Sequence, residues 1–158
     1  PELAAAVIED LGRNYVTVDD IQKFSPGKSS AATTYMYHLV HDDEDFWANL
    51  EWMPGAKSMY QFIEKYDPYI LSAASSRDPT SKIGKMKWLA KNTNFKKSRI
   101  NLVMRSQKQQ YAITGGKPNI LIDDYMKNIN EWEKKGGIGV HHTDPRKTIG
   151  ELKRLGFK

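Results

Sequence analysis

The stretch NILIDDY, residues 119–125, decides how the rest of this chain is interpreted. Three apolar residues, two of them β-branched, run directly into two adjacent carboxylates. An apolar run of this length, preceded by glycine and proline, is typical of a buried parallel strand. Ligands of open α/β sheets bind beyond the carboxyl ends of the strands, and Asp123 and Asp124 lie at such an end.

The acidic pair Asp123 and Asp124 has two interpretations. Adjacent carboxylates with no nearby base repel each other, and a cation relieves that repulsion. Because Mg²⁺ prefers carboxylate, water and phosphate oxygens, the first interpretation is a Mg²⁺ site at a sheet edge. In the second, Asp124 is the N-cap of a helix expected over residues 125–135. The pair alone does not decide between them.

Composition places the chain among globular proteins. Its 158 residues suit one domain with a real core, and 39% hydrophobic and 27% charged residues are ordinary for this class. We expect neither a membrane-spanning segment nor a signal peptide. Cysteine is absent, which excludes disulfides and thiolate zinc sites and fits a cytoplasmic location.

The net charge of +5 indicates an anionic partner, most simply a ligand that carries phosphate. A solvated basic surface explains the charge equally well. No recognised nucleic-acid-binding motif is present, so nucleic acid is not the expected partner.

From about residue 63 onward, expected strands and helices alternate. Strands are expected over residues 69–71, 100–104, 120–122 and 136–140, and helices over residues 56–66, 80–92, 125–135 and 148–155. This alternation indicates βαβ units and a parallel sheet covered on both sides. Upstream, helices are expected over residues 3–11, 20–24 and 31–40.

Three of the expected strand ends carry polar side chains. Ser72 ends the first strand, Lys108 follows the second, and Asp123 ends the third. In a parallel sheet these ends lie at the same edge. A hydroxyl and an ammonium group that hold phosphate oxygens, with carboxylates that hold Mg²⁺, form a phosphoryl-transfer site. Taken alone, the small hydroxyl residues after the first strand are better explained by a turn.

An aromatic segment, FWANLEWMPG at residues 46–55, precedes the alternating part. Core packing explains most such clusters. The alternative is an aromatic surface on which a nucleobase stacks, with Phe46 or Trp47 as the stacking residue.

With these residues in view, the sequence resembles the haloacid dehalogenase superfamily, in particular its 5′(3′)-deoxyribonucleotidase-like phosphatases. The resemblance covers nearly the whole chain. FWANLEWMPGA resembles the segment before the second family motif, ILSAASS the second motif and RSQKQQYA the region of the third. LIDDYMKNINEWEKKGGIGVHH resembles the fourth motif with the helix and strand after it, and it is the most specific of these matches.

The resemblance implies roles for individual residues and Mg²⁺ as the cofactor. The implied roles are Ser72 and Lys108 as catalytic residues, Ser72, Ala73, Lys85 and Lys108 as phosphate ligands, Phe46, Trp47 and Arg105 as substrate contacts, and Asp123 and Asp124 as metal ligands. Asp123 is the first choice among the metal ligands, with Asp124 as its partner.

The chain departs from the family at the first motif. In the family, the central strand ends in D-x-D, whose first aspartate is the nucleophile that becomes an aspartyl-phosphate. This sequence has no apolar strand ending in D-x-D, because Val18-Asp19-Asp20 lacks both the strand and the spacing. We therefore expect a strand that carries this motif upstream of Pro1.

The expected fold is a haloacid-dehalogenase-like α/β domain, with a Rossmannoid parallel sheet and helices on both faces. A small helical cap is expected over about residues 13–53, and the core over residues 54–158. The expected activity is Mg²⁺-dependent hydrolysis of phosphate monoesters, foremost (deoxy)nucleoside 5′-monophosphates. The alternatives are a catalytically inactive module that binds nucleotides and a phosphatase of this fold for other phosphate esters. No membrane partner is expected, and a homodimer is compatible with the sequence.

Overall fold

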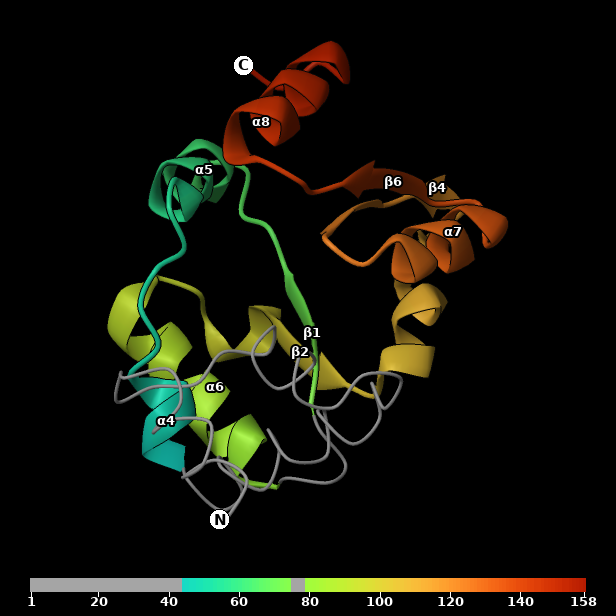
Figure 1. The fold of residues 1–158 in the computed structure, drawn as a ribbon. Coiled ribbons are helices and arrows are strands. Elements are labelled where there is room, and N and C mark those ends of the chain that lie inside the picture. The colour runs from blue at the N-terminus through green and yellow to red at the C-terminus, as the bar shows by residue number, and fades with distance from the viewer. Residues whose placement is uncertain (1–43, 75–78) are drawn as a thin grey trace, which may run out of the picture. The chain divides into compact units, whose positions relative to one another are not determined.

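The computed structural model describes residues 44–74 and 79–158. The chain divides into two units between Asp43 and Glu44, and the second holds all of the described residues. In this part the protein is a mixed α/β structure in which helices and short parallel strands alternate (Figure 1). The expected helices within residues 3–40, and most of the expected cap, lie outside the described residues. No helix in the described part is long and apolar enough to cross a lipid bilayer.

Every helix and strand expected after residue 55 is present, with ends shifted by a few residues. The helices are α4 (Glu44–Ala48), α5 (Ala56–Glu64), α6 (Thr80–Asn92), α7 (Met126–Lys134) and α8 (Pro145–Arg154), with 3-10 turns η1 (Lys97–Arg99) and η2 (Arg105–Tyr111). The strands are β1 (Ile70–Ala73), β2 (Ile100–Val103), β3 (Ile113–Thr114), β4 (Lys117–Pro118), β5 (Ile120–Asp123) and β6 (Ile138–His141). The short antiparallel β3–β4 hairpin is an addition that the sequence did not predict.

Two βαβ units carry the parallel strands. In the N-terminal βαβ unit (β1, α6, β2), Ile70 lies opposite Ile100 in a parallel pair. In the C-terminal βαβ unit (β5, α7, β6), Asp123 lies opposite His141, again in a parallel pair. The alternation in the sequence therefore predicted both units correctly.

The single continuous sheet that we expected is not present among the described residues. There, β1 pairs only with β2 and β5 only with β6, because no described strand lies along the other edge of β1 or of β5. The parallel strands thus form two sheets of two strands each. The 3-10 turn η2 follows β2 and contacts both β1 of the N-terminal βαβ unit and α7 of the C-terminal one.

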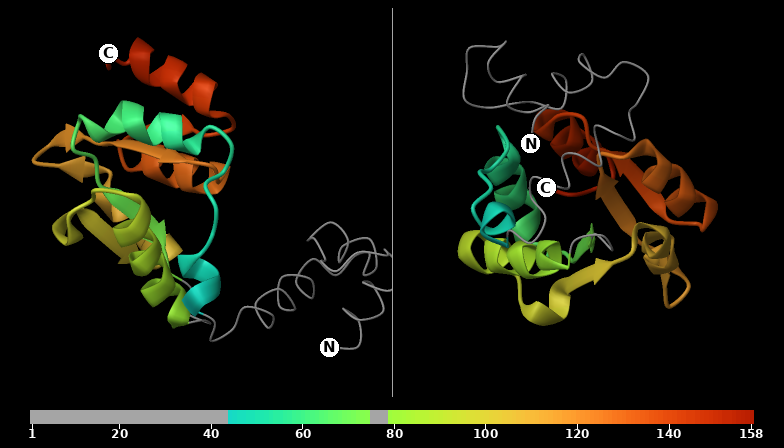
Figure 2. Two further views of the ribbon diagram at one scale, coloured as in Figure 1. Left: turned by 90° about the vertical axis from the view of Figure 1, so that its left-hand side faces the viewer. Right: turned by 60° about the horizontal axis from the view of Figure 1, so that its bottom comes forward.

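The buried core lies mainly in the C-terminal βαβ unit. It consists of Ala112, Leu121, Ile129 and Trp132, with Leu71 of β1 packed against it. Ile129 and Trp132 are three residues apart and therefore share one face of α7, which lies against β5 and β6 (Figure 2). The helix approaches so closely that a Cβ atom on Gly139 would lie 2.6 Å from Cγ2 of Ile129.

The start of α8 differs from the sequence prediction, which began this helix at residue 148. The helix begins at Pro145, and the side chain of Asp144 is the cap, accepting hydrogen bonds from the backbone N–H groups of Arg146 and Lys147. Aspartate is a preferred N-cap and proline is favoured at the first helical position. Thr148 is instead buried inside the helix, where its hydroxyl pairs with Nδ1 of His142.

Candidate functional site

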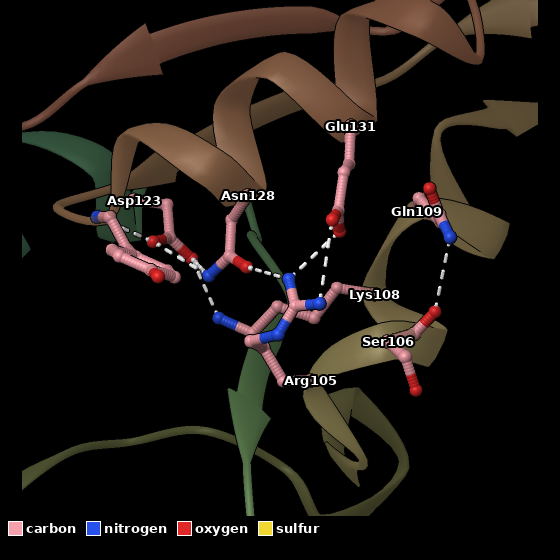
Figure 3. A network of polar contacts seen from close by, with 8 residues as sticks. Arg105, Ser106, Lys108, Gln109, Asp123, Asn128 and Glu131 are labelled. Carbon is pink, nitrogen blue, oxygen red and sulfur yellow. Dashed lines mark hydrogen bonds and ion pairs between the residues drawn. The ribbon is translucent and has the colours of Figure 1, made fainter. Parts of the chain in front are cut away.

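A buried ion pair between Lys108 and Asp123 forms the centre of the candidate site. Nζ of Lys108 lies 2.6 Å from Oδ2 of Asp123, and the two side chains are only 11% and 5% exposed. Lys108 comes from η2, directly after β2, whereas Asp123 ends β5. The structure thus brings together two predicted site residues that follow strands of different βαβ units (Figure 3).

The carboxylate of Asp123 accepts four hydrogen bonds. Besides Lys108, the backbone N–H of Tyr125 donates to Oδ1 at 2.9 Å. The side-chain amide of Asn128 donates to Oδ1 at 3.0 Å and to Oδ2 at 3.1 Å. Because a carboxylate offers about four lone-pair positions, the acceptor capacity of Asp123 is already used within the protein.

These contacts explain how Asp123 stays ionised in a buried position. Burial by itself raises the pKa of the carboxyl group, since the charged form loses its hydration. Hydrogen bonds from Lys108, from the Tyr125 N–H and from Asn128 act in the opposite direction, and together with the charge of Lys108 they outweigh burial. The pKa of Asp123 is therefore lowered, which favours the ionised carboxylate.

Asp124 is placed differently from its neighbour. Its side chain is exposed and makes no hydrogen bond or ion pair in the part of the chain that the structure describes. The N-cap of α7 is Tyr125, without a side-chain capping bond. The interpretation of Asp124 as a helix cap is therefore wrong. Its backbone carbonyl accepts from Nε2 of His141 at 3.0 Å, which ties the acidic pair to the end of β6.

The donor set for a divalent cation is small. Within residues 44–74 and 79–158, no group of three or more ligating side chains comes together. Mg²⁺ commonly binds one or two carboxylates and completes its shell with waters and substrate phosphate oxygens. Asp124 has free capacity for this, whereas Asp123 would first have to give up an internal hydrogen bond. The residues therefore fit Mg²⁺ only when phosphate oxygens complete the shell.

Lys85 adds a second ammonium group to the site. It lies on α6, is half-buried, and donates from Nζ to the backbone carbonyl of Ala73 at the end of β1, at 2.5 Å. Burial lowers the pKa of Lys85, and the positive charge of Lys108 lowers it further. The charged form of Lys85 is thus disfavoured, and an anion bound beside its ammonium group would favour it.

The predicted phosphate contacts at the end of β1 are only partly placed. Ser72 is half-buried, and its hydroxyl has no hydrogen bond among the described residues. The carbonyl of Ala73 is already engaged by Lys85. The roles predicted for Ser72 and Ala73 therefore rest on their position at the strand end.

The predicted aromatic contacts lie beside Lys85. Nζ of Lys85 is 5.4 Å from the ring centroid of Trp47, and the ring of Phe46 meets that of Trp47 edge-on at 5.3 Å. Trp47 also packs against Gly84 of α6, where a Cβ atom would overlap its side chain. Trp47 thus serves helix packing, whereas Phe46 is 39% exposed and accessible to a ligand.

Arg105, a predicted substrate contact, takes part in a network that the sequence did not reveal. It forms an ion pair with Glu131 at 2.8 Å and donates to Oδ1 of Asn128 at 3.1 Å. Sequence reasoning missed Asn128 as a site residue. The available signal was a polar side chain on α7 directly before the apolar positions Ile129 and Trp132, where only a partner inside the protein satisfies it.

Comparisons of this chain with protein-family models, with curated proteins and with solved structures gave no match. The roles implied by the resemblance to the haloacid dehalogenase superfamily therefore stay predictions. The structure contributes the geometry, in which Lys108 pairs with Asp123 at the end of β5 and Lys85 contacts the end of β1.

Proposed function

We propose that this chain is a Mg²⁺-dependent phosphomonoester hydrolase of the haloacid dehalogenase type that acts on (deoxy)nucleoside 5′-monophosphates. One observation carries the proposal. Lys85 binds the end of β1, and Lys108 forms a buried ion pair with Asp123 at the end of β5, directly before the exposed carboxylate of Asp124. Paired cations for phosphate oxygens and a carboxylate with free capacity are the groups that phosphoryl transfer requires.

Each cation has a distinct part in this reaction. Lys108 is held in place by Asp123, so its ammonium group contributes charge from a fixed position. Among the described residues, the one hydrogen bond of the Lys85 ammonium group is to a backbone carbonyl, which a phosphate oxygen replaces as the acceptor. Positive charge fixed in this way stabilises the negative charge that develops on the transferring phosphoryl group. Mg²⁺, held through Asp124, would polarise a phosphoryl oxygen as a Lewis acid.

The chemical step also requires a nucleophile. The resemblance assigns it to the first aspartate of a D-x-D motif, which attacks phosphorus while the alcohol leaves, and water then hydrolyses the aspartyl-phosphate. The cations alone are sufficient for binding. A chain without the nucleophile is therefore the alternative candidate, a module that binds nucleotides without cleaving them.

Binding and turnover measured together test the proposal. Calorimetry of the full chain with inorganic phosphate and with a nucleoside 5′-monophosphate, in the presence of Mg²⁺, measures binding, and phosphate release measures turnover. Lys85→Met should weaken phosphate binding by about 1.5–3 kcal/mol, the usual contribution of a charged hydrogen bond. Lys82→Met is the matched control, because Lys82 is exposed on the same helix and its loss removes the same charge.

The outcomes separate the candidates. Binding with Mg²⁺-dependent phosphate release supports the hydrolase. Binding without release supports the nucleotide-binding module. If Lys85→Met and Lys82→Met weaken phosphate binding equally, the loss of net charge explains the effect and Lys85 has no specific role. If the unmodified chain does not bind phosphate or nucleotide, both functions are refuted.

A further inference from the structure

Asn128 connects the centre of the site to the surface of the protein. It lies in the first turn of α7 and is only 6% exposed. Its Nδ2 donates to both carboxylate oxygens of Asp123, and its Oδ1 accepts from the guanidinium of Arg105 (Figure 3). Arg105 is held in turn by Glu131. The hydrogen bonds thus run without a break from Glu131 to Lys108.

The chemistry of these partners fixes the orientation of the Asn128 amide. An arginine guanidinium can only donate hydrogen bonds, and an ionised carboxylate can only accept them. The amide oxygen must therefore face Arg105, and the NH₂ group must face Asp123. A flipped amide would lose its bonds on both sides. Asn128 is thus locked in the one orientation that directs two donor contacts at Asp123.

We propose that Asn128 is a positioning residue that holds the Asp123 carboxylate in the orientation that receives Lys108. This inference rests on the proposed function, because it gives Asn128 its effect on phosphate hydrolysis through Lys108. Asn128 supplies two of the four hydrogen bonds of the carboxylate. Without them the carboxylate torsion, which is intrinsically broad, is less restrained, and the flexible Lys108 side chain moves with it.

Two substitutions separate this role from simple packing. Asn128→Asp keeps the size of the side chain and its acceptor toward Arg105, but turns an oxygen instead of an NH₂ group toward Asp123. Asn128→Ala removes the donor without adding a charge. The matched control is Asn94→Asp, because Nδ2 of Asn94 donates to Oε1 of Glu64 at 2.7 Å, an amide-to-carboxylate contact at another place in the protein.

The experiment combines a spectroscopic and a kinetic measurement on the full chain. Lysine labelled with ¹⁵N reports the ammonium protons of Lys108, which burial and the ion pair protect from exchange, and the signal is assigned with Lys108→Arg. Turnover of p-nitrophenyl phosphate gives kcat and KM, and thermal unfolding gives Tm.

Both Asn128 variants should lose the Lys108 signal and lower kcat about 10- to 100-fold, the usual effect of removing a group that orients a functional side chain. The fall in kcat should exceed the change in KM, and Asn94→Asp should retain both signal and kcat.

The results distinguish this inference from the proposed function. If the unmodified chain releases no phosphate, the proposed function fails, and the Lys108 signal alone decides on Asn128. A Lys108 signal that persists in both Asn128 variants would overturn the inference. If Asn128→Asp does not fold, Asn128→Ala decides by the same criterion. Unfolding of both would assign Asn128 to stability and would equally overturn the proposal.

Discussion

The two βαβ units share one topology but bury their strands to different extents. In the C-terminal unit, α7 contacts both β5 and β6, and Leu121 and Val140 are only 5% and 4% exposed. In the N-terminal unit, every residue of β1 and β2 is half-buried, and the strongest contacts of α6 are with α4. In the C-terminal unit, α7 covers both strands of its own unit. In the N-terminal unit, α6 packs mainly on α4, which lies outside the unit. The acidic pair thus comes from the well-packed unit, and the cations come from the helix of the less buried unit and the turn after it.

The largest expected effect comes from breaking the ion pair that links the two units. Asp123→Asn leaves the Lys108 ammonium group buried without a carboxylate, which costs about 3–5 kcal/mol of unfolding free energy for a buried pair. The control is Asp67→Asn, which breaks an ion pair with Arg99 in which the Asp67 side chain is 67% exposed. Exposed pairs contribute about 0–1 kcal/mol. Urea unfolding measures both losses, and losses of equal size would contradict the idea that the Lys108–Asp123 pair links the units.

Acid should remove the same contribution without a mutation. The pKa of Asp123 is lower in the folded protein than its ordinary value of 3.8. Its stabilising contribution is therefore complete above that value and is lost as pH falls below it, through the lowered pKa of the folded state. The difference in unfolding free energy between the unmodified chain and Asp123→Asn should be constant above about pH 5 and should shrink as pH falls below 3.8. A constant difference would show that the charge of Asp123 does not contribute.

The elements of both units could be predicted from sequence because their signals are local. The apolar run before Asp123, with glycine and proline upstream of it, predicted β5 from neighbouring residues alone. The meeting of Lys108 and Asp123 was also foreseeable, because both residues follow parallel strands. The separation into two sheets was not, since pairing of strands depends on which other strand lies beside β1 and β5.

The parts of the site that sequence reasoning missed depend on residues far apart in the chain. The amide oxygen of Asn128 accepts a hydrogen bond from Arg105, which is 23 residues away. Its own neighbours on α7 give no indication of that partner. The start of α8 was missed for a different reason. Asp144 and Thr148 are both residue types that cap helices, and only the Asp144 side chain lies beside free N–H groups.

Close contact between helix and strand in the C-terminal unit can be tested at Gly139. A Cβ atom there would lie 2.6 Å from Cγ2 of Ile129, a stiff side chain that is only 4% exposed. Gly139→Ala should therefore lower the unfolding free energy by about 1–3 kcal/mol through overpacking. Gly150→Ala in α8 is the opposite case, because a Cβ there meets no atom of the described residues within 4 Å. Alanine is the better helix former by about 1 kcal/mol, so this control should gain stability. A higher unfolding free energy in both variants would contradict the close contact between α7 and β6.

The smallest expected effect concerns the less buried N-terminal unit, where α4 packs on α6. Phe46 is 39% exposed and lies edge-on against Trp47, whose ring is close to the Lys85 ammonium group. A base that stacks on an aromatic ring contributes about 1–3 kcal/mol. Part of the Phe46 ring already packs on Trp47, so we expect Phe46→Ala to weaken binding of a nucleoside 5′-monophosphate by about 1 kcal/mol, the lower end of that range. Calorimetry with inorganic phosphate should show no change, since phosphate does not reach the ring.

Tyr69→Ala, which removes a 61% exposed ring just before the opposite end of β1, is the control and should affect neither ligand. Equal loss of nucleotide and phosphate binding in Phe46→Ala would assign the ring to helix packing instead of base recognition.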